Sequence, residues 1–209
     1  MSFVTCRAFP GERRRAMPAD AMVDDALATT TNAVTIGAPT VAVWPWLAQL
    51  GSGRAGWYSY DRVDNGGRPS AHRIVPEYQH VAPGDLLPAL PGSSEAFVVA
   101  SVTPASHLVL TVPDGSGGSH LSWEYLLQPT GFGGTRLVMR GRLSARWLES
   151  HRALARIPRP ILLAAARLGH RIMLARHLRG IKRRAEGRLA QPALAAGRAW
   201  TPETRLVWK

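Results

Sequence analysis

The sequence predicts an α+β protein in which a curved antiparallel sheet of about six to seven strands wraps around one long C-terminal helix. Two observations support this fold class. Short segments of alternating apolar and polar residues, separated by turns rich in glycine and proline, fill the middle of the chain. One long segment with helical periodicity follows them, over residues 159–188.

Length and composition favour a single domain. The chain has 209 residues, of which 45% are hydrophobic, enough for one sizeable core. We expect an irregular arm over residues 1–30, with one short helix near residues 20–27. A ligand-binding domain over residues 31–189 and a loosely held tail over residues 190–209 should follow.

The surroundings in which the chain works can also be predicted. No run of 18 uncharged apolar residues is present, which argues against a membrane-spanning helix. The single cysteine, Cys6, cannot form an intramolecular disulfide, and no signal-peptide core precedes it. Both features favour a cytoplasmic location.

The first elements alternate between strand and helix. Residues 31–37 are rich in β-branched side chains and predict a strand. Pro39 is suited to a helix start, Val43, Trp46 and Leu47 follow at helical spacing, and Gly51 ends the helix. We expect Pro45 to divide this helix into two short pieces. Residues 57–60 alternate like a strand, and a turn over residues 64–69 precedes a loop over residues 76–91.

Four further strands are predicted over residues 96–102, 107–112, 120–128 and 135–143. Their short connections are typical of an antiparallel meander. The final helix should face the sheet with one stripe, made of Ile161, Ala165, Leu168, Ile172, Ala175, Leu178, Lys182 and Ala185. This order of elements is that of a helix-grip fold.

The segment that follows the first strand is distinctive. Residues 38–61 read APTVAVWPWLAQLGSGRAGWYSYD and hold three of the seven tryptophans and two of the four tyrosines. This segment resembles the signature of the START-like helix-grip (SRPBCC) superfamily, which includes polyketide cyclase/dehydrase and lipid-transport groups. The resemblance continues through RIVPE at residues 73–77, Ser122-Trp123 and LRGIKRRAE at residues 178–186, and covers about residues 31–187. It implies a helix-grip fold with a cavity between the sheet and the long helix.

Three motifs of other functional classes are set aside on physical grounds. GSGRAG at residues 51–56 matches a nucleotide-binding pattern, but a helix precedes it where a strand is required, so we interpret it as a helix-ending turn. Residues 61–66 lack the ligands of a calcium loop. The seven histidines show no metal-binding spacing, and His170 and His177 share a helix face without a carboxylate nearby in the sequence. We therefore predict no metal and no cofactor.

The predicted cavity suits a small hydrophobic or amphipathic molecule, of a lipid-, polyketide- or sterol-like kind. The residues expected to contact it are Trp57, Tyr58, Tyr60, Trp123, Leu168 and Ile172. An enzyme resembling an aromatase or cyclase is the alternative, with Glu77 or Asp61 as general base and Tyr60 or Arg140 stabilising an enolate. The simpler interpretation of these four polar residues is that they form buried salt links and backbone hydrogen bonds, so a carrier is preferred to an enzyme.

Charge suggests a third function. The net charge is +12, and residues 142–188 contain 13 basic residues against two acidic ones, Glu149 and Glu186. Most basic helix faces are simply solvated. A weak contact with an anionic membrane or an acidic partner is the next interpretation. Nucleic acid is disfavoured, because no aromatic-interleaved basic platform or binding motif accompanies the charge.

Overall fold

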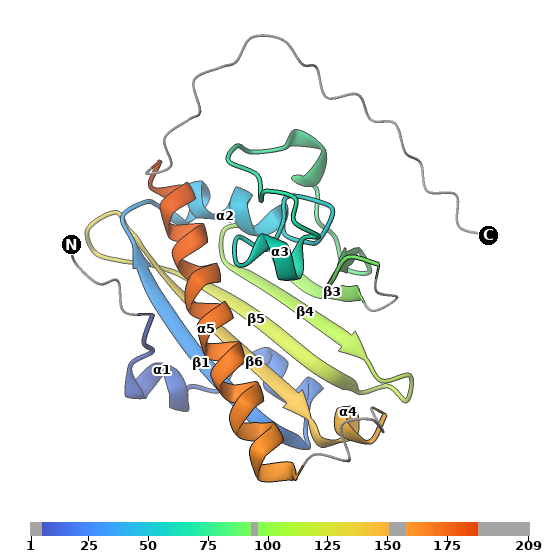
Figure 1. Cartoon of the computed structure of the whole chain (residues 1–209). Coiled ribbons are helices and arrows are strands. Elements are labelled where there is room, and N and C mark those ends of the chain that lie inside the picture. The colour runs from blue at the N-terminus through green and yellow to red at the C-terminus, as the bar shows by residue number, and fades with distance from the viewer. Residues whose placement is uncertain (1–5, 93–95, 151–157, 188–209) are drawn as a thin grey trace.

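The computed structural model describes residues 6–92, 96–150 and 158–187, and it contains a six-stranded antiparallel sheet in the order β1-β6-β5-β4-β3-β2 (Figure 1). The strands are β1 (Ala26–Ile36), β2 (Leu86–Pro88), β3 (Ala96–Thr103), β4 (His107–Pro113), β5 (Ser119–Pro129) and β6 (Thr135–Ser144). The short helix α4 (Ala145–Ser150) follows β6. The long helix α5 (Arg159–Ala185) lies across one face of the sheet. The predicted α+β fold is confirmed, and it has the helix-grip architecture that the sequence resemblance implied.

Helix α5 packs on the sheet through a face that only partly matches the one predicted. Its buried side chains are Leu174, His177, Leu178 and Ile181. Three residues of the predicted stripe point away, since Ile161, Leu168 and Ile172 are 61%, 60% and 50% exposed. The predicted stripe was therefore wrong in its N-terminal half but included Leu178, which is buried, and Ala185, which packs against the core. The rest of the true packing face carries two histidines and a glycine, which periodicity did not identify.

Between β1 and β2 the chain forms the remaining cover of this face. Helix α2 (Thr40–Ala48) contains Pro45 without dividing, which corrects the expected break, and it buries Val43, Trp46 and Leu47. The glycine turn ends it as predicted, with an isolated bridge between Gly51 and Gly56. Residues 57–60 are not a strand, since Tyr58 has φ 56°.

Three small elements follow Tyr58. They are α3 (Asp61–Asp64), the 3₁₀ turn η2 (Pro76–Tyr78) and the edge strand β2, which lies within the segment predicted as a loop. A three-residue strand at a sheet edge gives almost no periodic signal in the sequence.

The N-terminal arm covers the opposite face of the sheet (Figure 1). It contains α1 (Pro10–Arg14) and η1 (Pro18–Met22), and β1 begins at Ala26 rather than at residue 31. The short helix expected near residues 20–27 therefore lies earlier, as η1. Ala8 of the arm packs with Ala33 and Val138, whose side chains point to this outer face. The predicted tail over residues 190–209 lies outside the described residues.

Among the residues described, no helix is long and apolar enough to cross a membrane.

Candidate functional site

A cavity of about 220 Å³ lies between the sheet, helix α5 and the segment that holds α3. Most of its lining is apolar. The lining residues are Trp57, Ser59, Asp64, Ala89, Leu90, Phe97, Trp123, His170, Met173, Leu174 and His177. For comparison, an apolar cavity of about 150 Å³ holds benzene. The cavity therefore has room for a molecule of about one or two rings, or for one end of a larger molecule.

Three aromatic rings form one wall of the cavity. Phe97 of β3 and Trp123 of β5 have ring centroids 4.7 Å apart, and Trp57 meets both rings edge-on at 5.4 Å and 5.5 Å. The indole N–H of Trp57 donates to the Ala89 carbonyl at 3.0 Å, which fixes the ring. Aromatic residues placed on two strands and on the glycine-turn segment thus converge because inward-facing positions alternate along each strand.

Helix α5 contributes the opposite wall, through residues spaced one and two turns apart. His170, Met173, Leu174 and His177 all line the cavity. Such i, i+3, i+4 and i+7 spacing places all four side chains on one helix face. The spacing of the two histidines predicts their shared face, but the apolar periodicity of the helix favours a stripe of other residues.

Both ring nitrogens of His177 form hydrogen bonds within the protein. Its Nδ1 faces the Trp57 carbonyl, which can only accept, so Nδ1 carries the proton. Its Nε2 then accepts from the Tyr125 hydroxyl at 3.0 Å. Burial lowers the pKa of His177 to about 4, although the Trp57 carbonyl acts in the opposite direction. His177 is therefore neutral at pH 7.

Asp64 is the most unusual residue of the site. It is 3% exposed, and neither carboxylate oxygen accepts a hydrogen bond of good geometry from the described residues. Burial raises its pKa, and the negative charge of Asp61 raises it further. The backbone of Tyr60 and the Ser59 hydroxyl lie near enough only to moderate this rise. Both carboxylate oxygens are covered by the protein, so Asp64 borders the cavity without presenting its oxygens to it.

Two more polar groups complete the site. The indole N–H of Trp123 is buried and has no hydrogen-bond partner among the described residues. The imidazole of His170 lies beside this ring, with the centroids 6.0 Å apart, and burial lowers the pKa of His170. A carboxyl group, an indole N–H and a neutral imidazole thus border the mainly apolar cavity, but the carboxylate oxygens and the indole nitrogen are themselves covered by the protein.

The structure brings together only part of the predicted ligand site. Trp57 and Trp123 line the cavity as expected. Tyr58 is buried elsewhere, and its hydroxyl donates to the Trp46 carbonyl at 3.1 Å and accepts from the Gln49 amide at 2.9 Å. Tyr60 is 36% exposed beneath the guanidinium of Arg176. Leu168 and Ile172, on the exposed face of α5, do not line the cavity.

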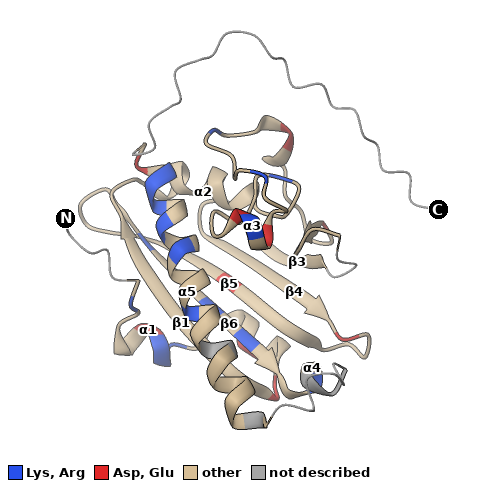
Figure 2. Ribbon diagram, viewed as in Figure 1, with Lys and Arg blue, Asp and Glu red and all other residues tan. Residues whose placement is uncertain are grey.

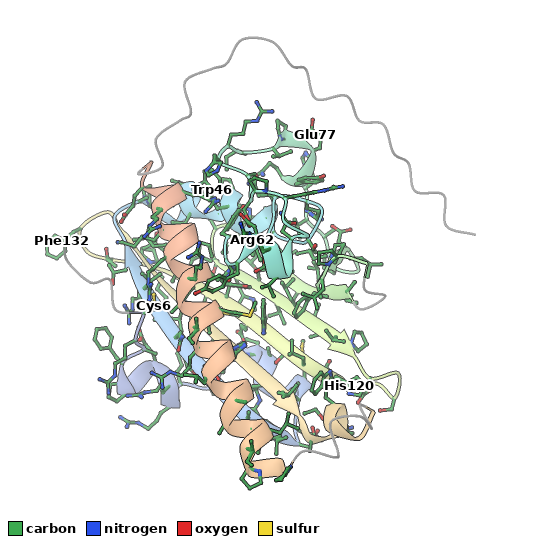
Figure 3. All side chains as sticks on the ribbon, viewed as in Figure 1. Cys6, Trp46, Arg62, Glu77, His120 and Phe132 are labelled. Atoms are coloured by element: carbon green, nitrogen blue, oxygen red, sulfur yellow. The ribbon has the colours of Figure 1, made fainter. Side chains whose placement is uncertain are left out.

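None of the four proposed catalytic side chains is among the lining residues. Tyr60 has been described above. The Asp61 carboxylate accepts hydrogen bonds from the Ser70 amide at 3.0 Å and the Ser70 hydroxyl at 2.5 Å. Glu77 is exposed on η2, at the outer edge of the molecule and away from the sheet (Figure 3). Arg140 points to the outer face of the sheet and binds the N-terminal arm. These side chains do not border the cavity; Arg140 and Asp61 instead form the ion pair and backbone hydrogen bonds of the simpler interpretation.

Sequence reasoning missed Asp64, Phe97 and His170 as lining residues. Asp64 was interpreted as a turn residue, because nothing local distinguishes a buried aspartate from a solvated one. The shared helix face of His170 and His177 was the one usable signal. The outward direction of Arg140 could have been predicted from the sequence. Arg136, Arg140 and Arg142 alternate with Leu137 and Met139, so the arginines point to the opposite face of the strand from the apolar side chains.

A metal site is not indicated by the part of the chain that the structure describes. No three His, Cys, Asp or Glu side chains lie together there in a way that could hold a metal ion.

Comparison with known proteins finds similarity of fold. No family model and no curated protein matches the chain. Among solved structures, it is similar to the Polyketide_cyc-like protein Cgl2372 from Corynebacterium glutamicum, with 16% identity over 78% of this chain and 93% of that one, and a TM-score of 0.48. It is also similar to NE0264 from Nitrosomonas europaea, with 13% identity over 83% and 100% of the two chains and a TM-score of 0.45. CalU16 from Micromonospora echinospora matches with 16% identity over 76% and 84%, and a TM-score of 0.35. These similarities concern the backbone fold alone.

Proposed function

We propose that the protein binds a small hydrophobic or amphipathic molecule in the cavity between the sheet and α5. The observation that carries this proposal is a cavity with an aromatic wall and a mainly apolar lining, which a few polar side chains, Asp64, His170 and His177, also border. Ligand sites are typically apolar cavities with a few convergent polar groups of this kind. The volume of about 220 Å³ favours a ligand of one or two rings over an entire lipid or sterol.

Filling the cavity tests this function. Ala89 lines the cavity, so Ala89→Leu should occupy ligand space, whereas Ala165→Leu adds the same atoms on the exposed face of α5. In isothermal titration with 2-naphthol, we expect Ala89→Leu to weaken binding about tenfold or more, since overpacking a filled site costs about 1–3 kcal/mol. Ala165→Leu should bind like the parent protein. Equal affinity in all three proteins, or no binding to the parent, would contradict the proposal.

An enzyme acting on a polyketide in the same cavity is the second candidate. It is favoured by a carboxyl group of raised pKa and an imidazole of lowered pKa, on Asp64 and His170, which both border the cavity. Such a pair is suited to general acid–base chemistry. Turnover of a model polyketide that disappears in Asp64→Asn, while binding persists, would favour the enzyme over the carrier.

A membrane-surface or acidic-partner function through α5 is the third candidate. Its exposed stripe begins with Ile161, Leu168 and Ile172 and continues with Arg176, Arg179 and Arg183. Figure 2 shows these basic residues along the C-terminal half of α5. Pelleting with anionic liposomes, lost at high salt and in Ile172→Glu, would support this function. A cytoplasmic location likewise stays a prediction.

A further inference from the structure

Among the described residues, no charged group is open to a ligand in the cavity. Asp64 is the one acidic side chain of the lining, and both of its carboxylate oxygens are covered by the protein. His170 and His177 are the basic ones, and burial lowers the pKa of each, so both rings are neutral at pH 7. No described Lys or Arg lines the cavity. A ligand inside therefore meets no charge with which it could pair.

Most of the neutral polar side chains of the lining are also engaged. Trp57 donates its indole N–H to a backbone carbonyl at 3.0 Å, and Ser59 donates its hydroxyl hydrogen to another at 3.3 Å. Both ring nitrogens of His177 are used, and the indole nitrogen of Trp123 is covered. This leaves His170, which is only partly buried, as the lining side chain that can exchange a hydrogen bond with a ligand.

The cost of removing water decides which ligands fit such a lining. An ionised carboxylate or ammonium group loses its hydration when it enters the cavity, and buried charges are tolerated in proteins only when they are paired and hydrogen-bonded. The lining supplies neither kind of partner. An uncharged hydroxyl group loses much less hydration, and one hydrogen bond replaces most of that loss.

The walls favour flat rings within the uncharged class. Phe97 and Trp123 have ring centroids 4.7 Å apart, and Trp57 meets both rings edge-on. Met173 adds a polarizable thioether from the helix side. Aromatic ligands pack well against such rings and against a thioether, in offset and edge-on arrangements.

We propose that the cavity selects uncharged aromatic molecules of one or two rings and rejects their ionised counterparts, whether acidic or basic. The inference rests on the proposed binding function, since it names the ligand class of the same cavity. A cavity with an accessible charge in its wall would instead prefer ligands of the opposite sign.

Three probes of similar shape and different charge test this inference. They are 2-naphthalenemethanol, 2-naphthoate and 2-naphthylmethylamine, whose amino group is protonated at the pH of the experiment, 7.5. Each is titrated into protein with ¹⁵N-labelled tryptophan, in which the indole signals of Trp57 and Trp123 report binding even when it is weak. We expect the alcohol to bind at least about tenfold more tightly than either ion, because only the ions lose hydration without a partner.

Two matched variants test whether the missing counter-charge causes this preference. Leu90 lines the cavity and is 44% exposed, so Leu90→Lys adds an ammonium group at the wall without burying it completely. Relative to the alcohol, 2-naphthoate should then bind about tenfold more tightly than it binds the parent, and high salt should reduce this gain. Leu86→Lys makes the same change at an exposed position outside the lining and should keep the ratio of the parent. Amide spectra of both variants establish that they are folded.

The outcomes are distinguishable. If either ion binds the parent protein as tightly as the alcohol does, the uncharged ligand class is wrong while the binding function stands. The inference also fails if Leu90→Lys leaves the preference for the alcohol over 2-naphthoate unchanged, because a missing counter-charge is then not its cause. If none of the three probes nor 2-naphthol binds, the proposed function itself fails.

Discussion

His177 joins helix α5 to the sheet and to the segment that follows α2. It bonds through one nitrogen to the Trp57 carbonyl and through the other to the Tyr125 hydroxyl. The bond from the Tyr125 hydroxyl requires a neutral ring, because Nε2 must accept it. Burial holds the pKa of His177 at about 4, against 6.5 for an ordinary histidine. The folded state therefore binds fewer protons here than the unfolded chain does.

The sign of the pH effect follows. A lowered histidine pKa gives stability that is fully present above pH 6.5 and is lost as the pH falls toward 4. A pKa shift of this size contributes roughly 3 kcal/mol to the free energy of unfolding at neutral pH. In urea unfolding between pH 7.5 and 4, His177→Gln should be less stable at neutral pH, and its stability should fall less on acidification, by up to about 3 kcal/mol. His80 is exposed, so His80→Gln is the control and should follow the parent protein. If the free energy of unfolding depends on pH equally in the parent and in His177→Gln, His177 does not cause the effect.

At this scale, prediction from sequence succeeded for residues whose bulk decides their place. Trp57 and Trp123 were expected at the cavity and are there, because large rings on inward-facing positions have no other place to be buried. Polar residues were harder. Asp61 and Asp64 stand three positions apart in one short helix, yet one is bonded to Ser70 and the other faces the cavity. Only tertiary contacts distinguish them.

Helix α5 and the segment after α2 approach each other closely at Gly180 and Tyr58. A Cβ added at Gly180 would collide with the Tyr58 carbonyl oxygen and lie 2.7 Å from the Tyr58 Cβ. Backbone atoms cannot give way as a flexible side chain can. The absence of a side chain at Gly180 therefore sets how near the helix lies to this segment.

Two glycine substitutions in α5 should have opposite effects. Gly180→Ala should lower the free energy of unfolding by about 1–3 kcal/mol, because the added methyl group forces the helix away. Gly169 is exposed with nothing near its Cβ position, so Gly169→Ala should raise it by up to about 1 kcal/mol through helix propensity. Urea unfolding measures both. A stabilising Gly180→Ala would show that this crossing is not tight.

The length of α5 could be predicted from the sequence, but its rotation could not. The apolar stripe through Ile161, Leu168 and Ile172 has regular helical spacing, yet these side chains are exposed. The packing face instead includes Gly180 and His177, chosen for close approach and hydrogen bonding rather than for apolar area. Periodicity measures hydrophobicity alone and so favours the wrong face when the true one carries such residues.

At the scale of the whole molecule, the sheet has two covered faces. Helix α5 and the aromatic wall cover the inner face, and the arm before β1 covers part of the outer face. The arm is held mainly by arginines of β6. Arg136 binds Glu12, and Arg142 binds the Val23 carbonyl. Charged contacts thus hold the arm against part of the outer face of the sheet.

Arg140 is the centre of this outer layer. It is 4% exposed, and its guanidinium donates to Asp20 and the Arg15 carbonyl, each at 2.7 Å, to the carbonyls of Glu12 and Arg13, and to the Thr31 hydroxyl. Arg140→Met would keep most of the packing volume and leave all these acceptors without their donor. Removing one partner of a buried ion pair costs about 3–5 kcal/mol.

We therefore expect Arg140→Met to lower the free energy of unfolding by about that amount and to release the arm before the rest of the molecule unfolds. The Ala19 amide, which donates to Glu124 at 2.9 Å, reports on the arm, and its hydrogen exchange should accelerate far more than that of amides in β5. Arg14→Met removes an exposed arginine from the same arm and should change neither quantity. If Arg140→Met costs less than about 1 kcal/mol and Ala19 stays protected, the arm is held by its apolar contacts instead, and the ionic layer contributes orientation rather than stability.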